Sequence, residues 1–414
     1  KVKSQSHNAK VKRQRSPFLN FDLCFFLSAF YFCFSRMTQM SALEIARKLV
    51  RLPSVNPMHD AASAGEGAVV DWLEQWGQSQ KLQTLREPVL PGRDNISFTI
   101  KNGDGPHLLL NGHTDTVSVA GMSIEPFSGE VRDGRLWGRG STDMKGPLAC
   151  MLAALLELRA REDWRGTVSV GCVVDEETEF QGIVKLIEDH DPWDFAVVGE
   201  PTNLRVVRGC KGCLRTIVRV RGRAAHSSDP AQGRNAIVGM APVLEAVQKF
   251  FDDEIGKFTR EGFSPCTGSV GLIEGGTAVN IVPDECVVTF EIRTLPGQDT
   301  GATFAAAEKF VRERIGEREG YELIFDPPYH DSPNFETAAD HPLVQTACAL
   351  RDQSEADTVA FGCDGSKIAG GGVPTIILGP GDISQAHTKD EFISLTDLEA
   401  GTAAYVELAR ELLK

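Results

Sequence analysis

Four short apolar runs constrain what this chain can fold into more than any other feature of its sequence. The runs cover residues 108–110, 167–174, 195–198 and 375–378. Uninterrupted apolar character is typical of strands that helices cover on both faces, as in parallel sheets. Residues 144–161, which are rich in Ala and Leu, predict one of the covering helices. We therefore expect an α/β fold whose core is a doubly wound, mostly parallel sheet.

A different pattern interrupts this fold between about residues 209 and 321. Strands are predicted at 215–220, 269–273, 286–292 and 321–325, and helices at 236–251 and 302–315. The order β-α-β-β-α-β is that of a ferredoxin-like α+β unit. We therefore expect a main domain formed by residues 37–208 and 322–414, with residues 209–321 inserted into it as a second domain.

The first 36 residues differ in composition from the rest of the chain. They hold seven Lys and Arg against one acidic residue, Asp22, and include an aromatic-rich run at 25–34. That run is shorter than the ~20 apolar residues that a membrane-spanning helix needs. Met37 directly precedes an amphipathic helix predicted at 41–52. We expect residues 1–36 to be an upstream or vector-derived extension outside the domains, and we expect no membrane partner.

The composition of the chain indicates which classes of binding partner and which cellular compartment to expect. The net charge is −14, and no folded segment shows the clustered Lys and Arg that phosphate contacts require, which excludes a nucleic-acid-binding role. The ten cysteines are scattered, as is usual for reduced, cytoplasmic proteins. Cys210 and Cys213 form the one close pair. No second pair lies at zinc-finger spacing, so we expect two ordinary thiols there rather than a zinc knuckle or a redox pair.

Histidine and carboxylate side chains follow the apolar runs at the ends of the predicted strands. His113 and Asp115 follow 108–110, Glu176 and Glu177 follow 167–174, Glu200 follows 195–198, and His387 lies beyond 375–378. In open α/β sheets, ligands bind beyond the carboxyl ends of the strands, so these groups are expected along one rim. One such residue alone is more often a solvated loop residue, but four equivalent placements indicate a site.

The residue types indicate a transition-metal site. Histidines and carboxylates without cysteine suit Zn²⁺, Mn²⁺ or Co²⁺ rather than Ca²⁺ or an iron–sulfur cluster. Asp143 is a candidate bridge, because a carboxylate can give one oxygen to each of two ions. A metal pair lowers the pKa of a bound water, and hydrolysis then needs a general base. The adjacent Glu176 and Glu177 offer one carboxylate for the metal and one for the water.

Five motifs carry a resemblance to a known family. They are GHTD at 112–115, GRGSTDMKG at 138–146, DEE at 175–177, GEPT at 199–202, and GPG at 379–381 followed by AH at 386–387. With them, the chain from Met37 onward resembles the M20 family of dinuclear zinc amidohydrolases, in the branch of acetylornithine deacetylases and succinyl-diaminopimelate desuccinylases. The resemblance implies two Zn²⁺ ions per subunit, with Co²⁺ or Mn²⁺ as alternatives.

The resemblance also implies a role for each motif residue. Asp143 bridges both ions, His113 and Glu200 hold one, Glu177 and His387 hold the other, and Glu176 is the general base. Asp115 holds the second ring nitrogen of His113, which orients the ring. The peptide bond between Asp143 and Met144 is expected to be cis. Gly379 and Gly381 are expected to line the substrate site.

For the inserted domain, the resemblance implies a lid that also joins two subunits. His226 would reach the active site of the partner subunit and donate a hydrogen bond to the developing oxyanion. Asn280 and Arg293 would hold the substrate, Arg293 as a bidentate partner for a carboxylate. A strand-end salt bridge is the alternative for Arg293. Cys210 stands where some relatives have a histidine. The active enzyme is expected to be a homodimer.

The expected activity is hydrolysis of a small-molecule N-acyl amino acid. N-Acetylornithine is the first candidate substrate, giving ornithine and acetate, with arginine biosynthesis as the setting. Succinyl-diaminopimelate desuccinylation and a dipeptidase or carboxypeptidase activity are alternatives within the family. A non-catalytic binding protein of the same fold is the alternative from another class; it would be expected to lack Glu176 or a metal ligand, and none is missing.

Overall fold

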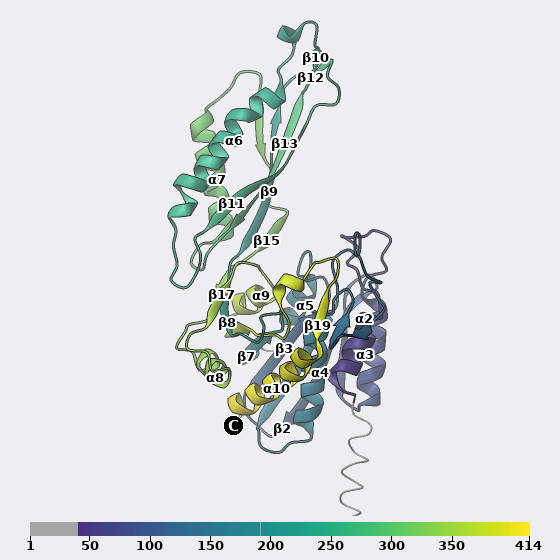
Figure 1. Cartoon of the computed structure of the whole chain (residues 1–414). Helices are drawn as coiled ribbons and strands as arrows, with labels where there is room; N and C mark the ends of the chain where they lie inside the picture. The colour runs from purple at the N-terminus through teal and green to yellow at the C-terminus, as the bar shows by residue number, and fades with distance from the viewer. Residues whose placement is uncertain (1–39, 191) are drawn as a thin grey trace, which may run out of the picture. The chain divides into compact units, whose positions relative to one another are not determined.

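The computed structural model describes residues 40–190 and 192–414. The expected extension at residues 1–36 therefore lies outside the described residues. Ser41–Lys414 is one compact unit. It contains a large mixed sheet with its helices and a smaller α+β sheet (Figure 1).

A nine-stranded sheet forms the core of the main domain. Its strands are β1 (Gln83–Leu90), β2 (Arg93–Asn102), β3 (His107–His113), β6 (Gly166–Val173), β7 (Phe195–Val198), β8 (Val207–Cys210), β16 (Phe335–Glu336), β17 (Asp357–Val359) and β18 (Thr375–Ile377). The order is β1-β2-β6-β3-β7-β18-β8-β16, with β17 beside β8. The four central strands β6, β3, β7 and β18 are parallel, whereas β1, β2 and β16 pair antiparallel towards the margins. The expected α/β class, with a parallel sheet centre, is confirmed.

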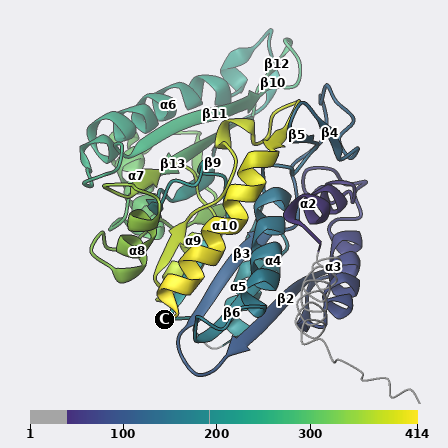
Figure 2. The same cartoon turned by 60° about the horizontal axis from the view of Figure 1, so that its bottom comes forward.

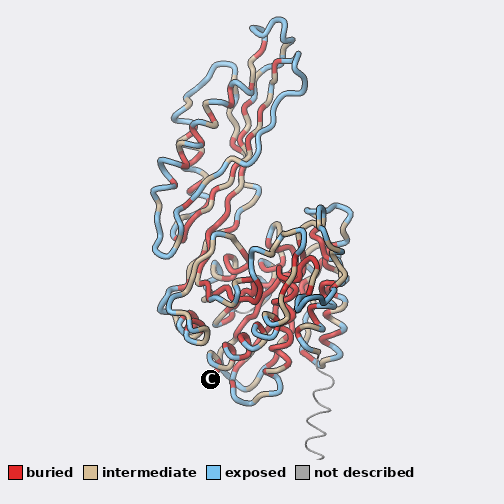
Figure 3. The backbone as a smooth tube through the Cα atoms, viewed as in Figure 1, coloured by how far each residue is buried: buried red, intermediate tan, exposed pale blue. Residues whose placement is uncertain are grey.

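Helices cover both faces of this sheet (Figure 2). They are α2 (Ala42–Val50), α3 (Gly67–Ser79), α4 (Lys145–Arg159), α5 (Gln181–Asp189), α8 (Pro342–Leu350), α9 (Gly365–Gly370) and α10 (Leu395–Leu412). On one face, Ile183 of α5 and Ile368 of α9 share a core cluster with Leu109 of β3. On the other face, α4 packs against α2 and α10, and Leu148 of α4 lies against Gly112 of β3. The continuous apolar runs are explained by this double cover, and Figure 3 shows the central strands as buried.

The inserted domain has its own sheet in the order β11-β13-β9-β14, with β15 also paired to β9. Its elements are β9 (Cys213–Arg221), α6 (Ala236–Asp253), β11 (Thr267–Gly275), β13 (Glu285–Arg293), α7 (Thr300–Ile315), β14 (Glu322–Phe325) and β15 (His330–Ser332). In β13, buried and half-buried residues alternate, because one face of the strand contributes to the core shared with α6. This is the expected ferredoxin-like unit. β14 and β15 lie beyond residue 321 and still pair with β9, so the inserted sheet continues past the expected boundary.

The described structure also contains two small sheets and the short 3-10 helices η1 (Pro230–Gln232), η2 (Ile255–Lys257) and η3 (Ile383–Gln385). β10 (Ala225–His226) pairs with β12 (Ile281–Val282), and β4 (Glu130–Arg132), β5 (Arg135–Trp137) and β19 (Phe392–Ser394) form a three-stranded sheet. β19 is joined to β5, so the segment that follows His387 lies beside the segment that leads to Asp143. None of the helices in the described part of the chain combines the length and apolar character needed to cross a membrane.

Candidate metal centre

The structure places the predicted ligands at the ends of the central strands. His113 is the last residue of β3, Glu176 and Glu177 lie in the turn after β6, Glu200 follows β7, and His387 lies in the loop after β18. Asp143 lies two residues before the start of α4, and its peptide bond to Met144 is cis, as expected. Because β3, β6, β7 and β18 are parallel neighbours, their carboxyl ends meet at one edge of the sheet.

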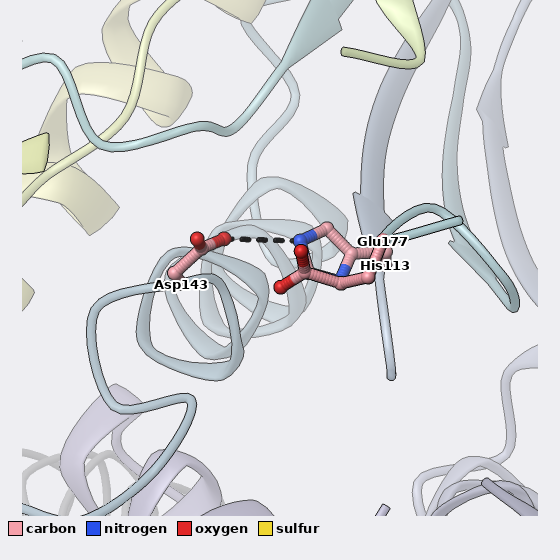
Figure 4. Close-up of side chains that lie close together, drawn as sticks. All are labelled: His113, Asp143 and Glu177. Atoms are coloured by element: carbon pink, nitrogen blue, oxygen red, sulfur yellow. Dashed lines mark hydrogen bonds and ion pairs between the residues drawn. The ribbon is translucent and has the colours of Figure 1, made fainter. Parts of the chain in front are cut away.

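Asp143 lies between two histidines, one on each side of its carboxylate. Its Oδ1 is 3.1 Å from Nε2 of His113, and its Oδ2 is 3.2 Å from Nε2 of His387. The dashed line in Figure 4 marks the contact with His113. Nε2 of His387 is also 3.2 Å from Oε2 of Glu177. A carboxylate with one oxygen facing each of two ligand groups has the geometry that a bridge between two ions requires.

The ligand atoms form two overlapping groups, and within each group all the atoms lie within 4.8 Å of one another. One group joins His113 and Asp143 to Glu177, and the other joins His113 to Glu176 and Glu200. Oε1 of Glu200 is 3.9 Å from Nε2 of His113, and it is buried without a hydrogen-bond partner among the described residues. A cation would satisfy this oxygen, and the His and carboxylate donors are those that Zn²⁺, Mn²⁺ and Co²⁺ accept. The residues present therefore fit a metal ion.

Burial, followed by crowding of carboxylates, determines the electrostatics of the centre. Burial raises the pKa of Glu176 and of Glu200 well above the usual value, and neighbouring carboxylates raise it further. Burial also opposes ionisation of Asp143, but hydrogen bonds from His113 and His387 outweigh it and hold the pKa of that carboxyl below its usual range. Hydrogen bonds to Asp143 and Glu177 raise the pKa of His387 to about 10. A cation bound at this edge would favour the ionised form of these carboxyl groups.

Asp115 contacts both His113 and the turn that carries the two glutamates. Nδ1 of His113 is 3.0 Å from the backbone oxygen of Asp115 and 3.4 Å from its Oδ1. The carboxylate of Asp115 accepts hydrogen bonds from the backbone amides of Glu176 and Glu177, both at 3.1 Å. The side chain thus connects the His113 strand end to the turn after β6, in addition to the ring contact expected from the sequence.

Sequence reasoning missed the residue that holds the backbone around Asp143. Oε1 of Glu391 accepts hydrogen bonds from the amides of Thr142 at 2.9 Å and Asp143 at 3.1 Å. Oε2 of Glu391 accepts from the amide of Gly140 at 3.0 Å and from Nη1 of Arg139 at 2.8 Å. Glu391 is 0% exposed. In the sequence, Glu391 is only an acidic residue shortly after His387. Its hydrogen-bond partners are distant in the chain, so no local pattern indicated its role.

Gly379 and Gly381, expected to line the substrate site, pack against the Glu200 turn. A Cβ on Gly379 would lie 2.1 Å from the backbone oxygen of Gly199 and 2.4 Å from that of Glu200. The backbone oxygen of Gly379 accepts from the amide of Thr202 at 3.0 Å. Gly381 has φ +91°, in the left-handed region that favours glycine. These contacts give both glycines a role in shaping the loop that carries Glu200.

The three residues expected to act from the inserted domain lie apart from the ligand cluster. His226 and Asn280 are exposed, and Nδ1 of His226 is 2.7 Å from Oγ of Ser228. Nε of Arg293 is 2.7 Å from Oε1 of Glu291, which is the salt bridge considered as the alternative for Arg293. Among the described residues, no hydrogen bond or ion pair joins these three side chains to the ligands.

The cysteines of the described chain do not contribute to this centre. Cys210 ends β8 and Cys213 begins β9, and both are buried, free thiols. Sγ of Cys213 is 3.4 Å from Oε2 of Glu291. Neither cysteine belongs to a group of possible ligands among the described residues.

A mixed α/β sheet with a histidine–carboxylate cluster at its strand ends, joined to an α+β lid domain, defines a metal-dependent hydrolase. Comparison with known proteins gives the family. The model of Peptidase family M20/M25/M40 matches residues 109–411, and the chain belongs to this family.

Relatives agree with this assignment. The chain is 32% identical over 372 residues to acetylornithine deacetylase from Vibrio vulnificus (strain CMCP6), covering 86% of this chain and 94% of the relative. Among solved structures, it is similar to a tripeptidase from Staphylococcus aureus, with a TM-score of 0.70, 23% identity, and coverage of 90% of this chain and 98% of that one. It is also similar to a dinuclear metal binding peptidase of the M20 family from Bacillus subtilis, with a TM-score of 0.62, 16% identity, and coverage of 90% and 97%.

Proposed function

We propose that this chain hydrolyses the amide bond of N-acyl amino acids, with N-acetylornithine as its preferred substrate and ornithine and acetate as products. The observation that carries the reaction class is the carboxylate of Asp143 placed between His113 and His387, with Glu176 and Glu177 adjacent in one turn. The choice of substrate rests on similarity to acetylornithine deacetylase from Vibrio vulnificus. The same choice places the protein in arginine biosynthesis.

Two metal ions would be held by residues that the structure brings together. Asp143 would contact both ions, His113 and Glu200 would hold the first, and Glu177 and His387 the second. Zn²⁺ is the proposed ion, with Co²⁺ or Mn²⁺ as substitutes that accept the same donors. When bound, such a pair polarises the substrate carbonyl and lowers the pKa of a water molecule. The similar Bacillus subtilis structure is described as dinuclear, which supports the count of two.

Glu176 is the proposed general base. It and Glu177 are adjacent, yet Oε2 of Glu176 is 4.0 Å from Nε2 of His113, whereas Oε2 of Glu177 is 3.2 Å from Nε2 of His387. The contact with His387 thus distinguishes Glu177 from Glu176, although both carboxylates lie in groups that include His113. Glu176, which is 9% exposed, can accept the proton of the attacking water and pass it to the leaving amine. Glu177 remains with His387 as a ligand.

We propose a homodimer joined through the inserted domain. β11 lies at an edge of its sheet, and an unpaired edge strand can pair with a second chain. Large apolar side chains are exposed on and near this edge: Leu272, Ile273, Val279, Ile281, Ile237 and Val238. His226, on β10, is exposed and available to a partner subunit. Multi-angle light scattering should give a dimer, and a monomer with full activity would contradict a catalytic role for His226 across subunits.

We also propose a cytoplasmic location. The eight cysteines that the structure describes are free thiols, which is the usual state in a reducing compartment. Fractionation of cells expressing the chain at native level would test this assignment. Recovery of the protein outside the cytoplasm would overturn it.

A substrate panel combined with metal analysis on one purified sample tests the proposed activity. N-Acetylornithine, succinyl-diaminopimelate and several dipeptides would be assayed for release of a free amine, and the zinc content measured by mass spectrometry. Turnover of N-acetylornithine above the other substrates, with two ions per chain, supports the proposal. Faster cleavage of succinyl-diaminopimelate or of dipeptides would contradict the proposed substrate and indicate another activity of the same family. Metal binding without turnover of any member of the panel would favour a non-catalytic protein.

A further inference from the structure

A buried network of charged side chains lies under the turn that carries Glu176 and Glu177. Its carboxylates are Glu66, Asp115 and Asp175, which are 0%, 0% and 2% exposed. Arg93, at the start of β2, is 8% exposed and contacts two of them. Burial of several carboxylates with one arginine is costly, and Oδ2 of Asp175 has no hydrogen-bond partner among the described residues. The network therefore indicates that the turn carrying Glu176 and Glu177 must be held in a defined position.

Arg93 links the N-terminal end of α3 to the turn after β6. Its Nε and Nη2 donate to Oε2 and Oε1 of Glu66 at 2.6 and 2.7 Å, which is a bidentate pair. Nη2 also donates to Oδ1 of Asp175 at 2.9 Å. A lysine at this position has one charged nitrogen and cannot reproduce the planar two-nitrogen contact. The contact is thus specific to arginine.

The turn itself is held at three consecutive amides. The amide of Asp175 donates to Oε1 of Glu66 at 3.2 Å. The amides of Glu176 and Glu177 donate to Oδ1 and Oδ2 of Asp115, both at 3.1 Å. Asp175 has φ +69°, a left-handed conformation that is uncommon for a residue other than glycine. The network therefore holds a backbone conformation that the local sequence does not favour.

Asn56 links the two halves of the network. Its Nδ2 donates to Oδ2 of Asp115 at 2.8 Å and to Oδ1 of Asp175 at 3.0 Å. Oγ1 of Thr178 donates to the same Oδ1 of Asp175 at 2.7 Å. The side chain of Asp175 is consequently fixed from three directions, by Arg93, Asn56 and Thr178. This fixed backbone sets the direction in which the side chain of Glu176 points.

We propose that Arg93 is a positioning residue for the reaction: through Asp175 and Glu66 it sets the turn so that Glu176 faces His113 while Glu177 faces His387. This rests on the proposed function, in which Glu176 is the general base. Arg93 acts through the turn and does not touch the substrate. Its loss should therefore reduce the chemical step more than substrate binding or the number of metal ions bound.

The test uses the variants Arg93→Met and Asp175→Asn, singly and together, in the full chain. Each single variant should lower kcat for N-acetylornithine about 10- to 100-fold, as the loss of outer-shell partners does, while KM changes less than about 2-fold and zinc stays at two per chain. The double variant should be no slower than the slower single variant, because both variants remove the same ion pair between Arg93 and Asp175. An unchanged kcat, or multiplying effects in the double variant, would overturn the proposal.

A matched control and a second readout keep the test decisive. Arg86→Met removes another multiply paired arginine, bonded to Asp71, Glu74 and Asp94 at the surface, and should leave kcat unchanged. If Arg93→Met does not fold, Arg93→Lys keeps the charge and should show the same loss of kcat.

The visible spectrum of the cobalt-substituted chain should change in the Arg93 variants and stay unchanged in the Arg86 variant. This spectrum tests the position of Glu177 even if the wild-type chain proves inactive on N-acetylornithine, an outcome that would refute the proposed substrate alone. If the Arg93 variants lost zinc in proportion to activity, Arg93 would be needed only for the structure of the metal site, and the proposal would be wrong.

Discussion

Glu391 holds the backbone of Asp143 from 248 positions further along the chain: its Oε1 accepts the hydrogen bond of the Asp143 amide at 3.1 Å. The same carboxylate accepts from the amides of Gly140 and Thr142. The loop that carries His387 and the loop that carries Asp143 are thereby joined next to the centre. Oδ2 of Asp143 and Nε2 of His387 end 3.2 Å apart. The proposed second ion site thus depends on a contact that no local sequence signal predicts.

The first prediction concerns this contact. Glu391→Gln replaces one accepting oxygen with an NH₂ group that faces backbone N–H donors, so the Asp143 loop should lose its support. We expect activity and affinity for the second zinc ion to fall by about 10- to 100-fold, as is typical for outer-shell partners of metal ligands. Zinc titration monitored by a chromophoric chelator would measure the affinity. Glu130→Gln, an exposed change on β4, is the control and should leave both unchanged.

The second prediction separates the two neighbouring glutamates. Glu176→Gln keeps the shape of the side chain but removes the proton acceptor, so turnover should fall by at least about 100-fold. The zinc content should stay at the wild-type value, measured by mass spectrometry on the same sample. Glu179→Gln, in the exposed part of the same turn, should behave as the wild type. Full activity of the Glu176 variant would exclude it as the base.

The third prediction concerns the close backbone packing behind Glu200. In Gly379→Ala the new methyl group would overlap the backbone oxygens of Gly199 and Glu200. We expect a loss of about 1–3 kcal/mol in the free energy of unfolding, the usual range for overpacking, together with weaker metal binding. Urea unfolding followed by circular dichroism would measure the stability. Gly370→Ala, where a Cβ has no neighbour within 4 Å, should not show this loss.

The fourth prediction concerns the thiols. The eight described cysteines are buried, and burial raises the pKa of Cys150 to about 12. Because the thiolate is the reactive form, iodoacetamide at pH 8 should leave these eight residues unlabelled in the folded protein and modify them in urea. Peptide mapping by mass spectrometry reads each site separately. Rapid labelling of Cys150 in the folded chain would contradict its placement in the core.

The fifth prediction concerns pH and stability. Burial lowers the pKa of His107 below its ordinary value of 6.5; the charge of Asp194 opposes this shift, and that of His190 adds to it. The folded chain therefore binds the His107 proton more weakly than the unfolded chain. Its contribution to stability is complete above pH 6.5 and is lost as the pH falls through the lowered pKa, with a slope of at most about 1.4 kcal/mol per pH unit.

The variant His107→Gln isolates this contribution. It cannot titrate, but its side chain can still reach Oγ of Ser169, which lies 2.8 Å from Nε2 of His107. The free energy of unfolding, measured in urea between pH 5 and pH 8, should fall less steeply towards low pH in the variant than in the wild type. Parallel curves for the two proteins would show that His107 is not responsible.

Much of the candidate site could be predicted because its proposed ligands belong to local patterns. His113, Glu177 and Glu200 follow apolar strands directly, and parallel strands bring such positions to one edge. His387 was harder, since a loop separates it from β18, and its motif identified it instead. The residues that were missed, such as Arg93 and Glu391, have no comparable signal. Their partners are distant in the chain, and any surface arginine or glutamate would look the same in the sequence.

The sequence by itself therefore determined the fold class, the inserted β-α-β-β-α-β unit and the candidate ligands, because each follows from hydrophobic periodicity or from short motifs. Only the tertiary structure decided how the ligands are held. Arg93 meets Asp175 because the start of β2 and the end of β6 lie side by side in the sheet. Glu391 meets Asp143 because β19 pairs with β5. Hydrogen bonds between buried groups depend on distance in space, and the fold alone sets that distance.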